Sequence, residues 1–207
     1  MTTNTATSSN DFAIDVSKKG LGYNKPQKMG KKLWAPMWIM AIMAFPIALA
    51  LGVVRSNAIS SGEAETTIAT LGHVTTGVMF IGFSAIFAAI SFAIARILGE
   101  FRKGGGEVQE SVSTDVRTLK MPPTAKIFIL GMAMGMMTLL VASIVHFVVA
   151  AQVSSGSISV ATAETAAITL EAVRRLGVAV YLVAITFGLA TIVKVLRFQA
   201  IRLRELV

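Results

Sequence analysis

The sequence contains no cysteine and few charged residues. Without cysteine the chain can form no disulfide, no thiolate metal site and no cysteine nucleophile. Charged residues make up 14% of the 207 residues, whereas an average soluble domain has about a quarter. Hydrophobic residues make up 54% of the chain. This balance favours a membrane protein over a soluble domain.

Four stretches lack any charged residue, and they cover residues 33–54, 66–95, 127–163 and 176–193. Each is about long enough to cross a hydrocarbon core, which needs roughly 20 apolar residues in a helix. The first stretch exceeds the roughly 7–15 apolar residues of a signal peptide, so we expect it to remain as a helix. The pattern predicts an all-α membrane protein whose four transmembrane helices form a bundle.

The domain organisation follows from these stretches. We expect one transmembrane domain over residues 33–198, with spans at about 33–54, 67–97, 126–151 and 173–196. Residues 1–32 are polar at the start and then rich in lysine, which predicts a disordered basic tail. Residues 199–207 form a second, short basic tail.

The positive charges are distributed unevenly along the chain. Of the 19 Lys and Arg residues, only Arg55, Arg174 and Arg175 lie outside the N-terminal tail, the 2–3 connection and the C-terminal end. Cytoplasmic segments of membrane proteins are enriched in Lys and Arg, so both termini are predicted to be cytoplasmic, in a multi-pass plasma-membrane protein. Because the cations flank the apolar stretches and form no single patch, the net charge of +8 does not indicate a nucleic-acid partner.

The 2–3 connection contains three consecutive glycines, Gly104 to Gly106. No strand is expected before them and no Gly-Lys-Ser/Thr follows them, so they do not match a phosphate-binding loop. We interpret them as a flexible turn. Pro122 and Pro123 then lead into the third span.

Small residues recur at helical spacing in the spans. Lipid gives no hydrophobic drive between helices, so close approach through small residues is expected to pack the bundle. The glycines expected at these contacts are Gly77, Gly131, Gly135, Gly177 and Gly188. The Gly131-x-x-x-Gly135 pattern also suits docking of a second chain.

Both histidines lie inside apolar stretches. His73, His146 and Arg175 each lie 19 to 23 residues from the basic residue that closes their stretch, which is about 28–34 Å in a helix. All three therefore reach a similar depth, with Arg174 beside them. One interpretation is a hydrogen-bonded structural cluster. The other is a b-type heme ligated by His73 and His146, with Arg174 and Arg175 near its propionates. Zinc would need more ligands.

Three functions remain open at this stage. The leading interpretation is an accessory or structural subunit of a larger membrane complex, non-catalytic by itself, because no base–nucleophile constellation is recognisable. Its partners would be the lipid bilayer and either other membrane subunits or further copies of the chain. The alternative is an electron-transfer subunit with a single bis-His heme b. A small transporter or channel is disfavoured, since the first three apolar stretches contain no acidic residue.

Overall fold

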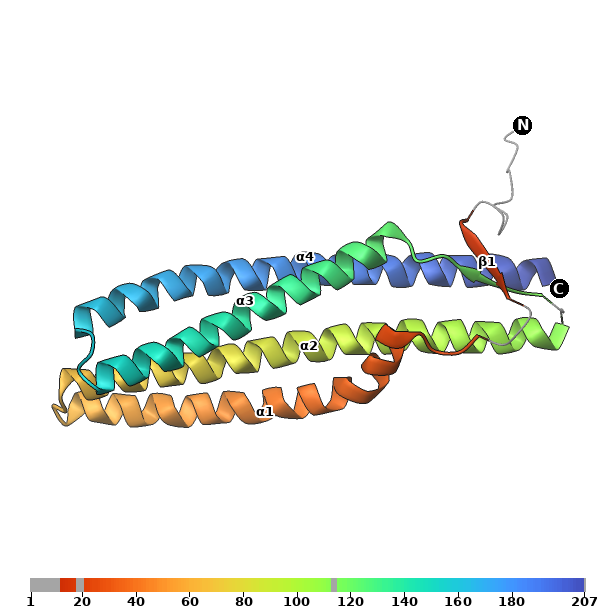
Figure 1. Ribbon diagram of the computed structural model, residues 1–207. Coiled ribbons are helices and arrows are strands. Elements are labelled where there is room, and N and C mark those ends of the chain that lie inside the picture. Colours follow the sequence, from red (N-terminus) through yellow and green to blue (C-terminus); the bar gives the residue numbers. More distant parts are fainter. Residues whose placement is uncertain (1–11, 18–20, 113–114, 207) are drawn as a thin grey trace, which may run out of the picture. The chain divides into compact units, whose positions relative to one another are not determined.

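The computed structural model describes residues 12–17, 21–112 and 115–206 (Figure 1). Four long helices form a bundle, and their bounds are α1 (Lys25–Ser60), α2 (Glu65–Val112), α3 (Pro123–Ser154) and α4 (Val160–Leu206). Strands β1 (Ile14–Ser17) and β2 (Val116–Leu119) pair in antiparallel register, with Ile14 opposite Leu119. The predicted four-helix bundle is confirmed, and each helix is long and apolar enough to cross a membrane.

Two of the helices are longer than a bilayer requires. Helix α2 has 48 residues and α4 has 47. At 1.5 Å per residue each measures about 70 Å, more than twice the roughly 30 Å of a hydrocarbon core. The predicted spans therefore form only parts of α2 and α4, and the remainder of each helix extends beyond the apolar stretch.

The chain forms two compact units. The apolar unit comprises Trp34–Ile90 and Leu130–Val183. The basic unit comprises the described residues of Met1–Leu33, Ser91–Ile129 and Ala184–Val207. By sequence, every Lys and Arg other than Arg55, Arg174 and Arg175 belongs to the basic unit.

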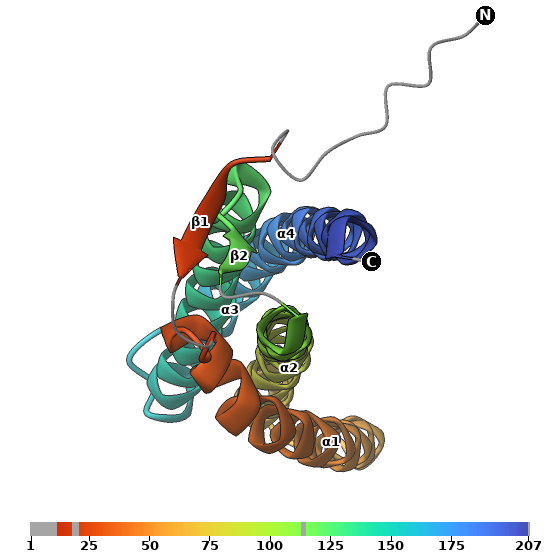
Figure 2. The ribbon, with the colours of Figure 1, turned by 90° about the vertical axis from the view of Figure 1, so that its right-hand side faces the viewer.

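In the apolar unit, α1 runs beside α2 (Figure 2), and the two helices contact each other through small side chains. Ala41, Ala44 and Ala48 form a buried stripe at helical spacing. On α2, a Cβ added to Gly82 would lie 3.1 Å from the ring of Phe45 and 3.3 Å from Cβ of Ala44. These small residues let the two helices approach closely, and they leave the large side chains of α1 on its outer face.

Tight turns join α1 to α2 and α3 to α4 in the same unit. Each turn has a glycine in the left-handed region, Gly62 with φ of 69° and Gly156 with φ of 72°. The amide of Glu63 donates to the Ala58 carbonyl at 3.0 Å, and that of Ser157 donates to the Gln152 carbonyl at 2.9 Å. Glycine adopts this conformation without a Cβ clash, which is why both helices end here.

Part of residues 1–32, which were expected to form a disordered basic tail, has described secondary structure. Residues 1–11 and 18–20 lie outside the described ranges, whereas β1 pairs with β2 and α1 begins at Lys25. At that start, Asn24 Oδ1 accepts from the Gln27 amide at 3.1 Å, and Gln27 Oε1 accepts from the Asn24 amide at 2.9 Å. This reciprocal capping box starts the helix eight residues before the apolar stretch. In the short basic tail predicted for residues 199–207, α4 continues up to Leu206.

The predicted flexible turn at Gly104–Gly106 is wrong, because all three glycines lie inside α2. A glycine disfavours a helix interior by roughly 1 kcal/mol relative to alanine. Packing within the basic unit offsets this loss. Gly105 lies directly against the side-chain amide of Gln199, and a Cβ on Gly106 would lie 3.1 Å from Leu21. Gly105 and Gly106 therefore make room for neighbours, and none of the three glycines ends the helix.

Candidate functional site

The two histidines contact each other in the apolar unit. Nδ1 of His73 on α2 lies 2.8 Å from Nδ1 of His146 on α3. Nε2 of His73 lies 3.1 Å from the carbonyl oxygen of Ala163 on α4. The exposed fractions are only 4% for His73 and 1% for His146. One chain of hydrogen bonds therefore joins three helices.

The partners fix the protonation pattern of this chain when both rings are neutral. A carbonyl only accepts, so Nε2 of His73 carries a hydrogen and its Nδ1 does not. Nδ1 of His146 must then donate to Nδ1 of His73. This assignment leaves Nε2 of His146 as a bare acceptor, and that atom is buried without a partner in the described part of the chain.

A polar pocket of about 500 Å³ adjoins the pair. Both histidines line it, together with Thr76 of α2 and the exposed charged residues Glu65 and Glu164. The volume lies within the range of small-molecule sites, about 300–1,000 Å³. The pocket gives the histidine pair a polar surrounding on one side, while the ring of Phe80 meets His146 edge-on at 4.9 Å between centroids.

Arg174 is held beside this cluster but does not contact the histidines. Its Nε donates to Oε2 of Glu171 at 2.7 Å, and its terminal nitrogen Nη2 donates to Oε1 of the same carboxylate. The guanidinium also lies over the rings of Phe80 and Phe83, at 5.8 and 5.6 Å from their centroids. Phe80 thus separates Arg174 from His146.

Arg175 takes a more peripheral place. Its Nε donates to Oε1 of Glu171 at 3.0 Å, and its side chain is 77% exposed. The structure therefore brings together two of the four residues predicted for a heme, His73 and His146. The other two residues, Arg174 and Arg175, instead bind Glu171.

The geometry of the pair differs from that of two axial heme ligands. Metal–imidazole bonds measure about 2.0–2.1 Å, as for zinc, so nitrogens on opposite sides of one metal lie about 4 Å apart. Here the two nitrogens are 2.8 Å apart and share a hydrogen bond, which leaves no room for iron between them. Among the described residues no group of three or more His, Cys, Asp or Glu could hold a metal ion. The residues as folded do not fit a bis-His heme.

Four of the five glycines singled out from the sequence face large side chains on neighbouring helices. Added Cβ atoms would lie 3.0 Å from Phe147 at Gly77, 2.8 Å from Tyr181 at Gly135, 3.0 Å from Leu139 at Gly177 and 2.9 Å from Phe128 at Gly188. Gly131 is half-buried on α3. Ser143 adds a hydrogen bond of 2.8 Å to the Gly77 carbonyl, where α2 and α3 meet.

Sequence reasoning missed the polar core of the basic unit. Gln109 is fully buried and binds the backbone of Arg117 twice, at 2.9 and 3.0 Å, beside the start of β2. The Nε of Arg202 reaches the same Gln109 oxygen at 3.3 Å. A single glutamine shortly after three glycines carries no pattern that could have revealed these contacts.

Comparisons with known protein families, with curated proteins and with solved structures gave no match. The fold and the site define the class of protein: an α-helical bundle with four candidate membrane spans, whose buried polar groups bind neighbouring helices to one another. Functional inference rests on these features.

Proposed function

We propose that this chain is a small integral membrane subunit that has no catalytic activity of its own and takes part in a larger membrane assembly. The observation that carries the proposal is the hydrogen-bonded chain from His146 through His73 to Ala163. The two histidines are the sequence's strongest candidates for chemistry, and they are engaged in joining α2, α3 and α4. Such interhelical polar contacts stabilise membrane bundles.

The proposed location is the plasma membrane, with both termini cytoplasmic. The support is the division of charge between the units, because the basic unit has all but three of the Lys and Arg residues. The apolar unit contains both tight turns and the residues Arg55, Arg174 and Arg175. Two of these three arginines are partly neutralised by Glu171.

The proposed contact to a partner subunit is the outer face of α1. In its most apolar segment 17% of the residues are buried, against 44% in α2. Large side chains cover this outer face, among them Ile39, Ile42 and Ile47. Helix α1 is thus attached to its own chain by a narrow alanine stripe, and most of its surface is free for a neighbouring subunit.

Photo-crosslinking in intact membranes tests this proposal. A photoreactive amino acid at position 42 should form a crosslink to a second polypeptide, because Ile42 is 52% exposed on α1. The matched control is position 44, where Ala44 is buried against α2 and a crosslink should stay within the chain. Crosslinks from position 42 to lipid alone would refute association through α1.

A further inference from the structure

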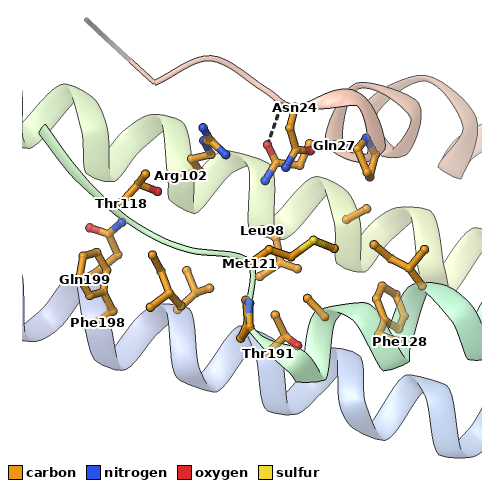
Figure 3. Close-up of a pocket in the computed structure, with 17 residues that line it drawn as sticks. Asn24, Gln27, Leu98, Arg102, Thr118, Met121, Phe128, Thr191, Phe198 and Gln199 are labelled. Carbon is orange, nitrogen blue, oxygen red and sulfur yellow. Dashed lines mark hydrogen bonds between the residues drawn. The ribbon is translucent and has the colours of Figure 1, made fainter. Parts of the chain in front are cut away.

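The basic unit encloses a pocket of about 260 Å³ (Figure 3). Four segments contribute to its wall: the start of α1, the second half of α2, the connection from β2 into α3, and the second half of α4. The segments are far apart in sequence, so the pocket exists only because the basic unit is folded. None of its residues belongs to the histidine cluster.

The wall of the pocket combines apolar and polar side chains. On α2, both Ala95 and Arg102 line the pocket. They are seven positions apart, which is about 10 Å along the helix axis. The apolar side chains of Phe128 and Ile129 belong to one part of the wall, and Gln199 and Thr118 belong to another. Figure 3 shows Phe128 at the right of the pocket with Gln27 above it, and Gln199 at the left beside Phe198. Apolar and polar side chains thus lie side by side around the pocket, which suits an amphiphilic ligand.

Two buried polar atoms of the wall have no partner. They are Nε of Arg102 and Oε1 of Gln199, and neither has a hydrogen bond within the described ranges. No Asp or Glu is among the described residues that line the pocket. A buried N–H without a partner is unfavourable, and an oxyanion that accepts a charge-assisted hydrogen bond from Nε of Arg102 would relieve it. The amide of Gln199 can donate as well as accept, because it carries both groups.

The uncharged stretches of the helices that line the pocket begin or end beside the pocket. The uncharged stretch of α2 ends at Ala95 and that of α4 at Val193, while α3 enters its stretch after Lys126. The pocket therefore lies where a bilayer's hydrocarbon gives way to headgroups. Basic pockets between membrane helices at this level bind the headgroups of anionic lipids.

We propose that this pocket binds the headgroup of an anionic membrane lipid. Its phosphate accepts a hydrogen bond from the Arg102 guanidinium, a hydroxyl of the headgroup donates to Oε1 of Gln199, and its first apolar carbons contact Phe128. The volume of about 260 Å³ is slightly below the range of small-molecule sites, about 300–1,000 Å³, so the pocket holds the headgroup region and not the whole lipid. The acyl chains extend into the bilayer. This site is independent of the proposed subunit role.

The test is lipid binding by the full-length protein in detergent. Titration with phosphatidylglycerol should raise the midpoint of thermal unfolding and leave one bound lipid in native mass spectra. Phosphatidylcholine at the same concentration should do neither. The substitution Arg102→Gln should weaken phosphatidylglycerol binding tenfold or more, since Arg102 is the only charged residue among the described residues that line the pocket. Arg197→Gln is the matched control, because it removes an exposed α4 charge that does not line the pocket.

Each remaining outcome decides against the proposal. Equal stabilisation by soluble glycerol phosphate would mean a free phosphate-ester site. Equal stabilisation by phosphatidylcholine, or equal losses in the Arg102 and Arg197 variants, would mean that no specific anion site exists.

If Arg102→Gln fails to fold, Gly105→Ala replaces it. Its Cβ displaces the flexible end of Gln199 and should weaken phosphatidylglycerol binding severalfold while the protein stays folded.

Discussion

His73 and His146 illustrate how a polar side chain becomes a structural element in an apolar surrounding. In water an imidazole exchanges hydrogen bonds with solvent at little net gain. Within a bilayer water is scarce, and a buried ring nitrogen without a partner is costly. The two rings satisfy each other, and the Ala163 carbonyl satisfies the third nitrogen. The fourth nitrogen, Nε2 of His146, is the one left open in the described structure.

We expect His73→Ala and His146→Ala each to destabilise the bundle by about 1–3 kcal/mol, because each leaves a buried partner unsatisfied. The double substitution should cost less than the sum, with a coupling energy of about 0.5–2 kcal/mol. Thermal or denaturant unfolding in detergent measures all three. Strict additivity would show that the rings do not interact.

The same preparations settle the heme question spectroscopically. Protein produced with ample heme should show no Soret band, because the two nitrogens bind each other. A Soret band that disappears in both single variants would show that the rings separate around iron, and would replace the structural role with electron transfer. Thr165→Ala is a suitable control for both measurements, since its hydroxyl is exposed and bonds only within α4.

At the scale of the helices, hydropathy gave the spans but not the helix ends. An apolar stretch indicates which part of a helix can contact hydrocarbon. It does not indicate how far the helix continues beyond that part. Helix α1 starts at the Asn24–Gln27 capping box, a local signal that the tail's polar composition concealed. Gly105 was misjudged because its partner Gln199 is distant in sequence. Counting residues predicted that the two histidines lie at a similar level, as their contact requires, whereas the contact itself depends on helix rotation.

Gly30 brings α1 against the backbone of α2 in the basic unit. A Cβ added to Gly30 would lie 2.6 Å from the Phe92 carbonyl oxygen and 2.8 Å from the Arg96 backbone nitrogen. Backbone atoms of a helix cannot move aside individually. We therefore expect Gly30→Ala to destabilise the protein by about 1–3 kcal/mol, the range of overpacking, in thermal unfolding experiments.

The control for this substitution is Gly104→Ala on α2. Nothing lies within 4 Å of an added Cβ at Gly104, and alanine favours a helix interior by up to about 1 kcal/mol over glycine. Gly104→Ala should therefore be neutral or stabilising. A loss of stability in Gly104→Ala equal to that in Gly30→Ala would mean that backbone contact at Gly30 is not the cause.

At the scale of the whole molecule, charge separates the two units more clearly than hydrophobicity does. Helices α2 and α4 contribute to both units, so the same helix passes from an apolar stretch into a charged one. The basic unit also has the ion pairs of Lys103 with Glu107 and of Lys120 with Asp15. Exposed pairs of this kind contribute little to stability, about 0–1 kcal/mol each. The asymmetry of charge therefore bears on membrane orientation more than on folding.

This asymmetry predicts which segments face the cytoplasm. Ser61 and Ser157 are exposed in the tight turns of the apolar unit, and Ser111 is exposed near the end of α2 in the basic unit. Since the natural sequence has no cysteine, single cysteines at these positions can be labelled without background. In intact cells a membrane-impermeant reagent should label Ser61→Cys and Ser157→Cys, while Ser111→Cys should react only after permeabilisation. Permeabilised cells provide the control that each cysteine is reactive.

Labelling of Ser111→Cys in intact cells, with protection of the two turn positions, would reverse the orientation. It would also place the pocket beside Arg102 at the outer leaflet, so the lipid experiment would then have to use lipids of that leaflet.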